Sequence, residues 1–87
     1  MRLEQWYGSG EYGEINGRSV FYKRSGSGEP LICIHGFPTA SWDFADIWPT
    51  LISRFDTVAH DMLGFGRSDK SRRDITVKLQ ADIIEQL

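Results

Sequence analysis

The sequence predicts an α/β domain in which an antiparallel hairpin leads into a parallel sheet with flanking helices. Three observations support this prediction: an Asn-Gly pair between two short strand-like segments, a continuous apolar run after them, and then helical and strand patterns in alternation. The predicted strands cover about residues 11–15, 18–25, 30–35 and 56–60, and the predicted helices about 41–53 and 76–87. Because two helices are few for four strands, we expect residues 1–87 to form an incomplete domain.

The hairpin is predicted from the Asn16-Gly17 pair, since both central positions of a tight hairpin turn favour positive φ. The segment RSVFYKRS after the turn alternates, with Val20 and Tyr22 on one face and Phe21 and Lys23 on the other. The first two strands are therefore expected to pair with each other in antiparallel fashion.

The later elements are predicted from apolar spacing. The run LICIH is typical of a strand covered on both faces of a parallel sheet. Ser41 is placed to cap the next helix, and Pro49 is expected to bend or restart it. Thr76 is placed to cap the last helix.

Composition and charge argue against several classes of partner. Ten basic residues face twelve acidic ones, and the net charge of −2 favours neither nucleic acid nor an anionic membrane. The start of the chain is polar, so neither a signal peptide nor a membrane-spanning helix is expected. The single cysteine, Cys33, lies in the apolar run and is interpreted as a small core residue rather than a nucleophile. A reducing cytoplasm is the expected compartment.

The segment His35-Gly36-Phe37-Pro38 carries the most informative chemistry. A parallel strand that ends at His35 brings the following backbone to the carboxyl edge of the sheet, where open α/β folds bind ligands. Gly36 is expected to allow a sharp turn there. Pro38 has no N–H, so the free backbone donor is the N–H of Phe37, which suits a developing oxyanion. Phe37 and Pro38 would also give the site an apolar wall.

This HGFP segment, together with DMLGFGRSDK after the next strand, resembles the N-terminal part of the α/β-hydrolase fold. The most similar branch contains epoxide hydrolases and haloalkane dehalogenases, and the pair of motifs is also similar to the mesoderm-specific-transcript type of hydrolase. The resemblance covers Glu11 to Leu87. It implies a small-molecule substrate, a strand order of 1-2-4-3, and the Phe37 N–H as one donor of the oxyanion hole.

The sequence lacks catalytic residues that the family pattern requires. It contains no G-x-S-x-G segment, and in the family the nucleophile lies on an elbow after the next strand, which these residues do not include; the catalytic histidine and the later acid are missing as well. We therefore expect the chain to be the N-terminal part of a hydrolase that acts on an ester, an epoxide or a halocarbon through a Ser or Asp nucleophile. The alternative is a non-catalytic segment of the same fold that serves as a binding or interaction module.

Five other motif residues are expected to have structural roles. His35 is interpreted as a turn histidine that hydrogen-bonds the loop, and Asp61 as a carboxylate that holds the following glycine loop through backbone N–H groups. Gly64 and Gly66 match the structural turn of the family, and Ser68 is expected to anchor that loop. His60 is interpreted as a strand residue rather than a ligand.

No cofactor or metal is expected. GFG lacks the third glycine of a dinucleotide-binding motif, Lys70-Ser71 lacks the glycine that precedes it in a phosphate-binding loop, and no His, Cys and Asp set has zinc spacing. The expected macromolecular partner is the rest of the hydrolase fold, or a second copy of the chain, against the exposed edge of the strand LICIH.

Overall fold

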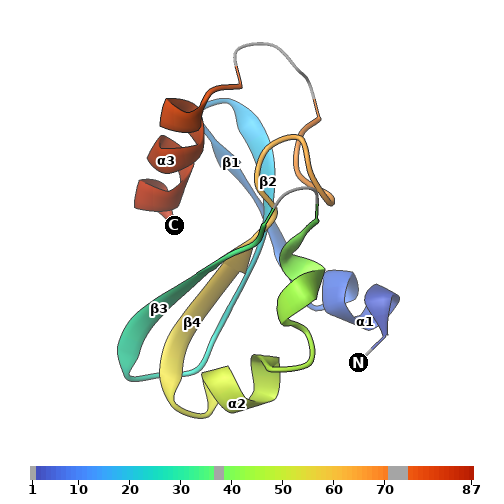
Figure 1. Cartoon of the computed structure of the whole chain (residues 1–87), viewed down its shortest axis with the longest axis vertical. Coiled ribbons are helices and arrows are strands. Elements are labelled where there is room, and N and C mark those ends of the chain that lie inside the picture. The colour runs from blue at the N-terminus through green and yellow to red at the C-terminus, as the bar shows by residue number, and fades with distance from the viewer. Residues whose placement is uncertain (1, 37–38, 71–74) are drawn as a thin grey trace.

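The computed structural model describes residues 2–36, 39–70 and 75–87, and these form one mixed four-stranded sheet with helices on both faces (Figure 1). The strands are β1 (Glu11–Ile15), β2 (Arg18–Ser25), β3 (Glu29–Ile34) and β4 (Phe55–His60), each within one residue of its predicted range. Their order in the sheet is β1-β2-β4-β3, which is the order that the resemblance implied. The predicted α/β architecture is confirmed.

The β1–β2 hairpin has the turn expected from its sequence. Asn16 and Gly17 have φ angles of 53° and 75°, and the flanking residues Ile15 and Arg18 are paired. Positive φ at both central positions matches the twist of the two strands, so this part of the fold is determined locally.

Strand β3 pairs in parallel with β4, with Cys33 opposite Ala59, and no other described strand lies beside it. Cys33 is buried, whereas Ile32 and Ile34 on the other face are 42% and 51% exposed. The prediction that this strand is covered on both faces is therefore wrong for the described residues. One face of its carboxyl half is packed, and the other face is open to solvent.

The packed face of the sheet is covered by α1 (Leu3–Gly8), by the short 3₁₀ helix η1 (Ser41–Phe44) and by α2 (Trp48–Ile52). The main core cluster consists of Trp6, Tyr7, Phe21, Cys33, Ala45, Trp48 and Ala59. Helix α1 was not predicted, because the first ten residues were interpreted only as a polar segment. Aromatic side chains bury large areas, so two consecutive aromatic residues anchor even a six-residue helix.

The helix predicted over 41–53 is instead two short helices, η1 and α2, with residues 45–47 between them. Pro49 lies in the first turn of α2, where its missing N–H costs no helical hydrogen bond. Ser41 does not cap a helix: its hydroxyl is buried and accepts a hydrogen bond from the Trp6 indole N–H at 3.0 Å. The Ser41 hydroxyl therefore binds a residue distant in the sequence instead of capping the helix that follows it.

Helix α3 (Val77–Gln86) packs on the opposite face, against β1 and β2 (Figure 1). Thr76 caps it as predicted, since its hydroxyl accepts a hydrogen bond from the Leu79 N–H at 3.1 Å. Ile83 is fully buried against Val20 and Leu63. Across the three described ranges, no helix combines the length and the apolar character needed to cross a bilayer.

Candidate functional site

The candidate site lies where β3 ends, at His35 and Gly36. Phe37 and Pro38, the predicted oxyanion donor and apolar wall, lie outside the described residues, so their predicted roles stay predictions. On either side of them, the Thr39 N–H donates to the Gly36 carbonyl at 3.0 Å. The end of β3 is thereby tied to the start of the next segment at the carboxyl edge of a parallel strand pair.

The surroundings of Gly36 leave room for a small side chain. It is not among the glycines with positive φ, and a Cβ at this position would meet no described atom within 4 Å outside its chain neighbours. The expectation that Gly36 allows a sharp turn stays a prediction, because residues 37 and 38 of that turn lie outside the described residues. Neither backbone conformation nor packing excludes a small side chain at position 36.

His35 is the turn histidine that the sequence predicted, and its ring hydrogen-bonds the backbone of Gly36, after β3, and of Met62, after β4. Its ring is buried, Nε2 lies 2.9 Å from the Met62 nitrogen, and Nδ1 lies 2.8 Å from the Gly36 oxygen. Because the Met62 N–H is a donor, Nε2 accepts, and Nδ1 therefore carries the proton and donates to Gly36. The ring of Phe65 packs edge-on against the imidazole with a centroid distance of 5.5 Å. Both nitrogens are thus engaged within the protein.

Asp61 joins Ser41, in the segment after β3, to the glycine loop after β4, which spans residues 62–68. Its carboxylate is fully buried and accepts hydrogen bonds from the backbone N–H of Ser41 and of Arg67, each at 2.8 Å. A Cβ on Gly66 would lie 2.1 Å from Asp61 Oδ2, and both Gly66 and Gly64 have positive φ. Glycine is therefore needed at position 66 for a physical reason, and the predicted loop-holding role of Asp61 matches these contacts.

Ser68 anchors the end of this loop. Its hydroxyl donates to the Asp61 carbonyl at 2.5 Å and accepts from the Phe21 N–H at 2.9 Å. Both hydrogen bonds are buried, and they connect the loop to strand β2. The hydroxyl is therefore fully used in structure, as expected, and is not placed as a nucleophile.

Tyr7 reaches the same buried centre from α1. Its pKa is raised to about 12, first by burial and then by the Asp61 carboxylate. The phenol therefore keeps its proton at all ordinary pH values and donates a hydrogen bond to Asp61. Sequence reasoning missed this residue. The spacing of Leu3, Trp6 and Tyr7 at i, i+3 and i+4 was the signal that could have identified the helix.

Lys23 is a second residue that sequence reasoning missed. Its amine lies 3.9 Å from the centre of the Trp6 ring and donates to the Ser9 hydroxyl at 2.8 Å. Burial lowers the pKa of this amine. The amine holds α1 and the residue after it against the sheet through a cation–π contact and a hydrogen bond. Strand alternation alone could not show which face would be covered by aromatic residues.

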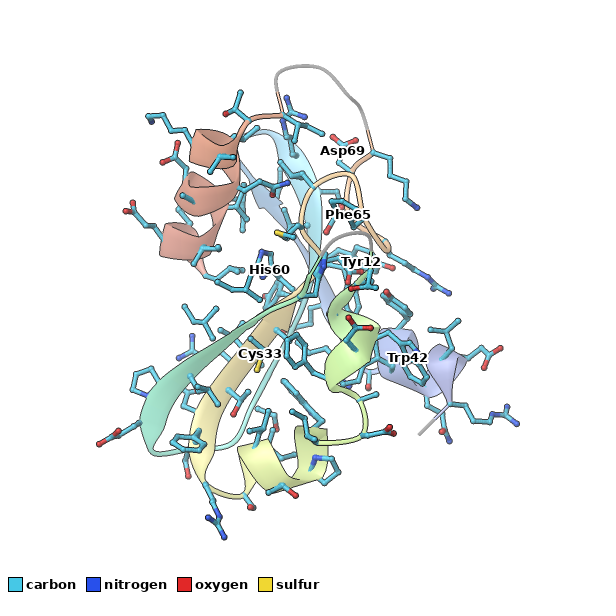
Figure 2. All side chains as sticks on the ribbon, in the orientation of Figure 1. Tyr12, Cys33, Trp42, His60, Phe65 and Asp69 are labelled. Atoms are coloured by element: carbon cyan, nitrogen blue, oxygen red, sulfur yellow. The ribbon has the colours of Figure 1, made fainter. Side chains whose placement is uncertain are left out.

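His60 lies at the end of β4 and is fully buried in the middle of the molecule (Figure 2). Neither ring nitrogen has a hydrogen-bond partner among the described residues. Burial, followed by the charge of His35, lowers the His60 pKa to about 4. The interpretation of His60 as a strand residue agrees with this position. In the described part of the chain, no group of three His, Cys, Asp or Glu residues could hold a metal ion.

Cys33 is buried in the core cluster, also as expected. Burial raises the pKa of its thiol, which disfavours the thiolate that a nucleophile requires.

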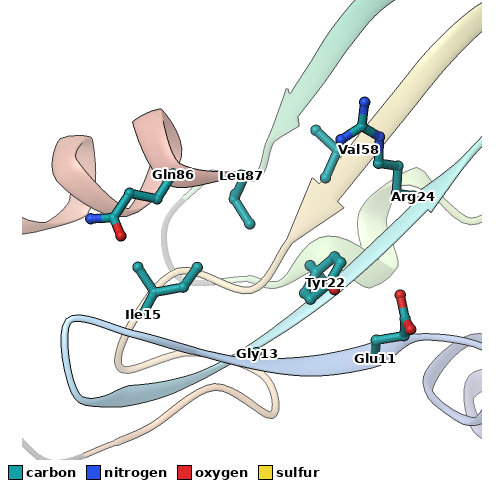
Figure 3. Close-up of a pocket in the computed structure, with 8 residues that line it drawn as sticks. All are labelled: Glu11, Gly13, Ile15, Tyr22, Arg24, Val58, Gln86 and Leu87. Atoms are coloured by element: carbon teal, nitrogen blue, oxygen red, sulfur yellow. The ribbon is translucent and has the colours of Figure 1, made fainter.

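Among the hollows that the described residues line, two lie on different sides of the sheet. One, of about 330 Å³, lies between α3 and strands β1, β2 and β4 (Figure 3). None of its lining residues belongs to the segments 35–41 or 61–68. The other hollow, of about 450 Å³, adjoins the candidate site, and its lining includes Tyr7, Thr39, Trp42 and Arg67. Only the second hollow has lining residues beside the turn.

The family model described as "alpha/beta hydrolase fold" matches residues 29–87. The chain belongs to this family.

The relatives within the family include hydrolases of known type. The chain is 43% identical to the mesoderm-specific transcript protein of Mus musculus over 91 aligned residues, which cover 98% of this chain and 27% of that protein. It is 32% identical to a soluble epoxide hydrolase of Corynebacterium sp., covering 84% of this chain and 26% of that enzyme. The structure of the epoxide hydrolase CorEH without ligand superposes with a TM-score of 0.81 and 29% identity, covering 87% and 27% of the two chains. The chain thus spans about a quarter of the length of these relatives.

Proposed function

We propose that this α/β-hydrolase chain is the N-terminal part of a hydrolase that acts on a small, largely apolar substrate: an ester, an epoxide or a halocarbon. In this proposal the chain supplies one backbone donor of the oxyanion hole, the N–H of Phe37. One observation carries the proposal. His35, directly after the end of β3 in the parallel pair β3–β4, accepts a hydrogen bond from Met62 of the loop after β4, at the carboxyl edge where open α/β sheets bind ligands.

The proposed chemical role follows from the nature of a backbone donor. A tetrahedral intermediate places negative charge on the former carbonyl oxygen, and an N–H already aimed at that oxygen stabilises the charge without reorganisation. A Ser nucleophile would form such an intermediate directly from an ester. An Asp nucleophile would first displace a halide or open an epoxide, and the resulting enzyme ester would pass through a similar intermediate during its hydrolysis. Removal of one such donor lowers turnover about a hundredfold to a thousandfold.

The nucleophile is expected on a segment that these residues do not contain. The sequence has no G-x-S-x-G, and the side chains that could attack a substrate are engaged elsewhere. Ser41 accepts from Trp6, Ser68 bridges Asp61 and Phe21, and Cys33 is buried. We therefore assign the attack itself to another part of the protein.

The test is an assay of the full-length gene product with p-nitrophenyl acetate, styrene oxide and 1-bromobutane as separate probes. Hydrolysis of at least one probe, with turnover lost when the nucleophile downstream of residue 87 is replaced, supports the proposal. No hydrolysis of any probe, with a full-length protein that melts cooperatively, would favour the non-catalytic alternative.

The alternative, a binding or interaction module, has one observation in its favour. Ile32 and Ile34 expose apolar surface next to an edge strand with no described neighbour on its outer side. Such an edge accepts another strand through main-chain hydrogen bonds. In the hydrolase proposal, the same edge is covered by the rest of the fold.

A further inference from the structure

The second hollow, of about 450 Å³, has a lining in which apolar and charged residues meet. It combines the apolar and aromatic residues Leu3, Tyr7 and Trp42 with the charged residues Asp43 and Arg67. These residues come from α1, from η1 and from the glycine loop, three segments that are distant in the sequence. A concave surface of this size, mostly apolar and with a few charged groups, is the usual form of a small-molecule site.

The guanidinium group of Arg67 lies over the ring of Tyr7, with its central carbon 4.5 Å from the ring centre. Both residues are anchored on the Asp61 carboxylate, which accepts hydrogen bonds from the Arg67 backbone N–H at 2.8 Å and from the Tyr7 hydroxyl. Because the Tyr7 ring is buried and fixed in this way, it gives the guanidinium a firm platform. Arg67 is therefore held more closely than an ordinary surface arginine.

The same guanidinium group has unused hydrogen-bonding capacity. It forms neither an ion pair nor a hydrogen bond with another residue in the described part of the chain. The other charged residue in the described lining, Asp43, accepts a hydrogen bond from the Thr39 hydroxyl at 2.5 Å. The guanidinium N–H groups are therefore open to an anion. Because Asp43 adds a negative charge to the lining, an anion with a single charge is favoured over a dianion.

We propose that this hollow binds a small monocarboxylic acid with an apolar or aromatic body. The carboxylate pairs with the Arg67 guanidinium, whose planar fork of N–H donors matches the two carboxylate oxygens. The body of the ligand covers apolar surface of Trp42, which is half-buried, and of Leu3, which is 44% exposed. The proposal goes beyond the proposed function and does not rest on it, because it involves binding and no reaction.

The test is a titration of the ¹⁵N-labelled full-length protein with phenylacetate, followed by NMR. The indole N–H signal of Trp42, assigned with the variant Trp42→Phe, reports binding at this hollow and not elsewhere in the protein. Phenylacetamide has the same shape without the charge and is the matched probe. We expect phenylacetate to shift the Trp42 signal in a saturable way and phenylacetamide to bind at least tenfold more weakly, because it lacks the charge-assisted pair with Arg67.

Two arginine variants complete the test. Arg67→Met removes the charge and leaves an unbranched side chain, whereas Arg24→Met removes an exposed arginine that pairs with Asp56 and does not line this hollow. We expect Arg67→Met to weaken phenylacetate binding at least tenfold and Arg24→Met to change it less than twofold. A Trp42 signal that does not respond to phenylacetate, or that responds equally in the wild type and in Arg67→Met, would overturn the proposal. Neither result depends on hydrolysis, so failure of the proposed function leaves this measurement unaffected.

Discussion

The Asp61 carboxylate accepts a hydrogen bond from the backbone N–H of Ser41 at 2.8 Å, across twenty residues of sequence. The same carboxylate accepts from the Arg67 N–H, and the backbone carbonyl of Asp61 accepts from Ser68. One buried residue therefore joins the segment after β3 to the whole glycine loop after β4. The first three predictions concern this buried centre and its neighbourhood.

We expect Asp61→Ala to destabilise the protein by about 2–6 kcal/mol, because the N–H groups of Ser41 and Arg67 lose their acceptor and each loss costs about 1–3 kcal/mol. Asp61→Asn keeps one oxygen acceptor and is expected to lose less. Urea denaturation of the full-length protein measures both. Asp43→Ala, at an exposed carboxylate, is the control. Equal stability of Asp61→Ala and the control would show that these hydrogen bonds contribute nothing.

Gly66→Ala and Gly36→Ala form a matched pair. A Cβ at position 66 would enter the Asp61 carboxylate, and the positive φ of 52° adds backbone strain. A Cβ at position 36 meets open space and an ordinary φ. We expect Gly66→Ala to lower the melting temperature by at least 5 °C and Gly36→Ala to change it by less than 2 °C. The reverse order of the two shifts would contradict the geometry described for Asp61.

Stability should fall as pH drops from about 6.5 to about 4, because of His60. The ordinary pKa of the ring is 6.5, and in the folded protein the value is about 4. Between these values the unfolded chain binds a proton that the folded chain does not, so acid favours unfolding. The loss is complete near pH 4 and amounts to roughly 3 kcal/mol at 1.36 kcal/mol per pKa unit.

His60→Phe provides the comparison, since it keeps a buried ring and removes the titration. We expect the difference in free energy of unfolding between wild type and variant to vary between pH 4 and 6.5 and to be constant above pH 7. Chemical denaturation at a series of pH values measures it. A difference that is independent of pH throughout would refute the assignment.

The isolated 87-residue chain should associate through strand β3. Its outer edge has no described neighbour, Ile32 and Ile34 are exposed beside it, and no charge interrupts the middle of the strand. We expect sedimentation velocity to show a dimer or a larger species. Ile34→Lys should shift the chain toward monomer, because a charged side chain at an edge opposes strand pairing.

Val77→Lys is the control for this experiment, since Val77 is 88% exposed on α3 and far from β3 in sequence. It should leave the association unchanged. A monomeric wild-type chain with a cooperative melt would mean that the β3 edge is protected in a way that the described residues do not show.

Several parts of the fold could be predicted because their physics is local. Asn16-Gly17 favours positive φ whatever surrounds it, and the hydroxyl of Thr76 reaches an N–H only three residues away. The roles of Asp61 and Ser68 were also predicted, but from the resemblance of the motif DMLGFGRSDK rather than from residue chemistry alone. The Phe37 donor was predicted from the missing N–H of Pro38 as well as from the resemblance, and it lies outside the described residues.

The sequence by itself determined the strands, the hairpin turn and the last helix, because periodicity and caps act within a few residues. Only the tertiary structure decided that Ser41 binds Trp6 instead of capping a helix, that α1 covers the sheet, and that His60 is buried without partners. Residues 6 and 41 are 35 positions apart. A hydrogen bond over that distance leaves no trace in local spacing, because the energy that selects it comes from burying both partners together.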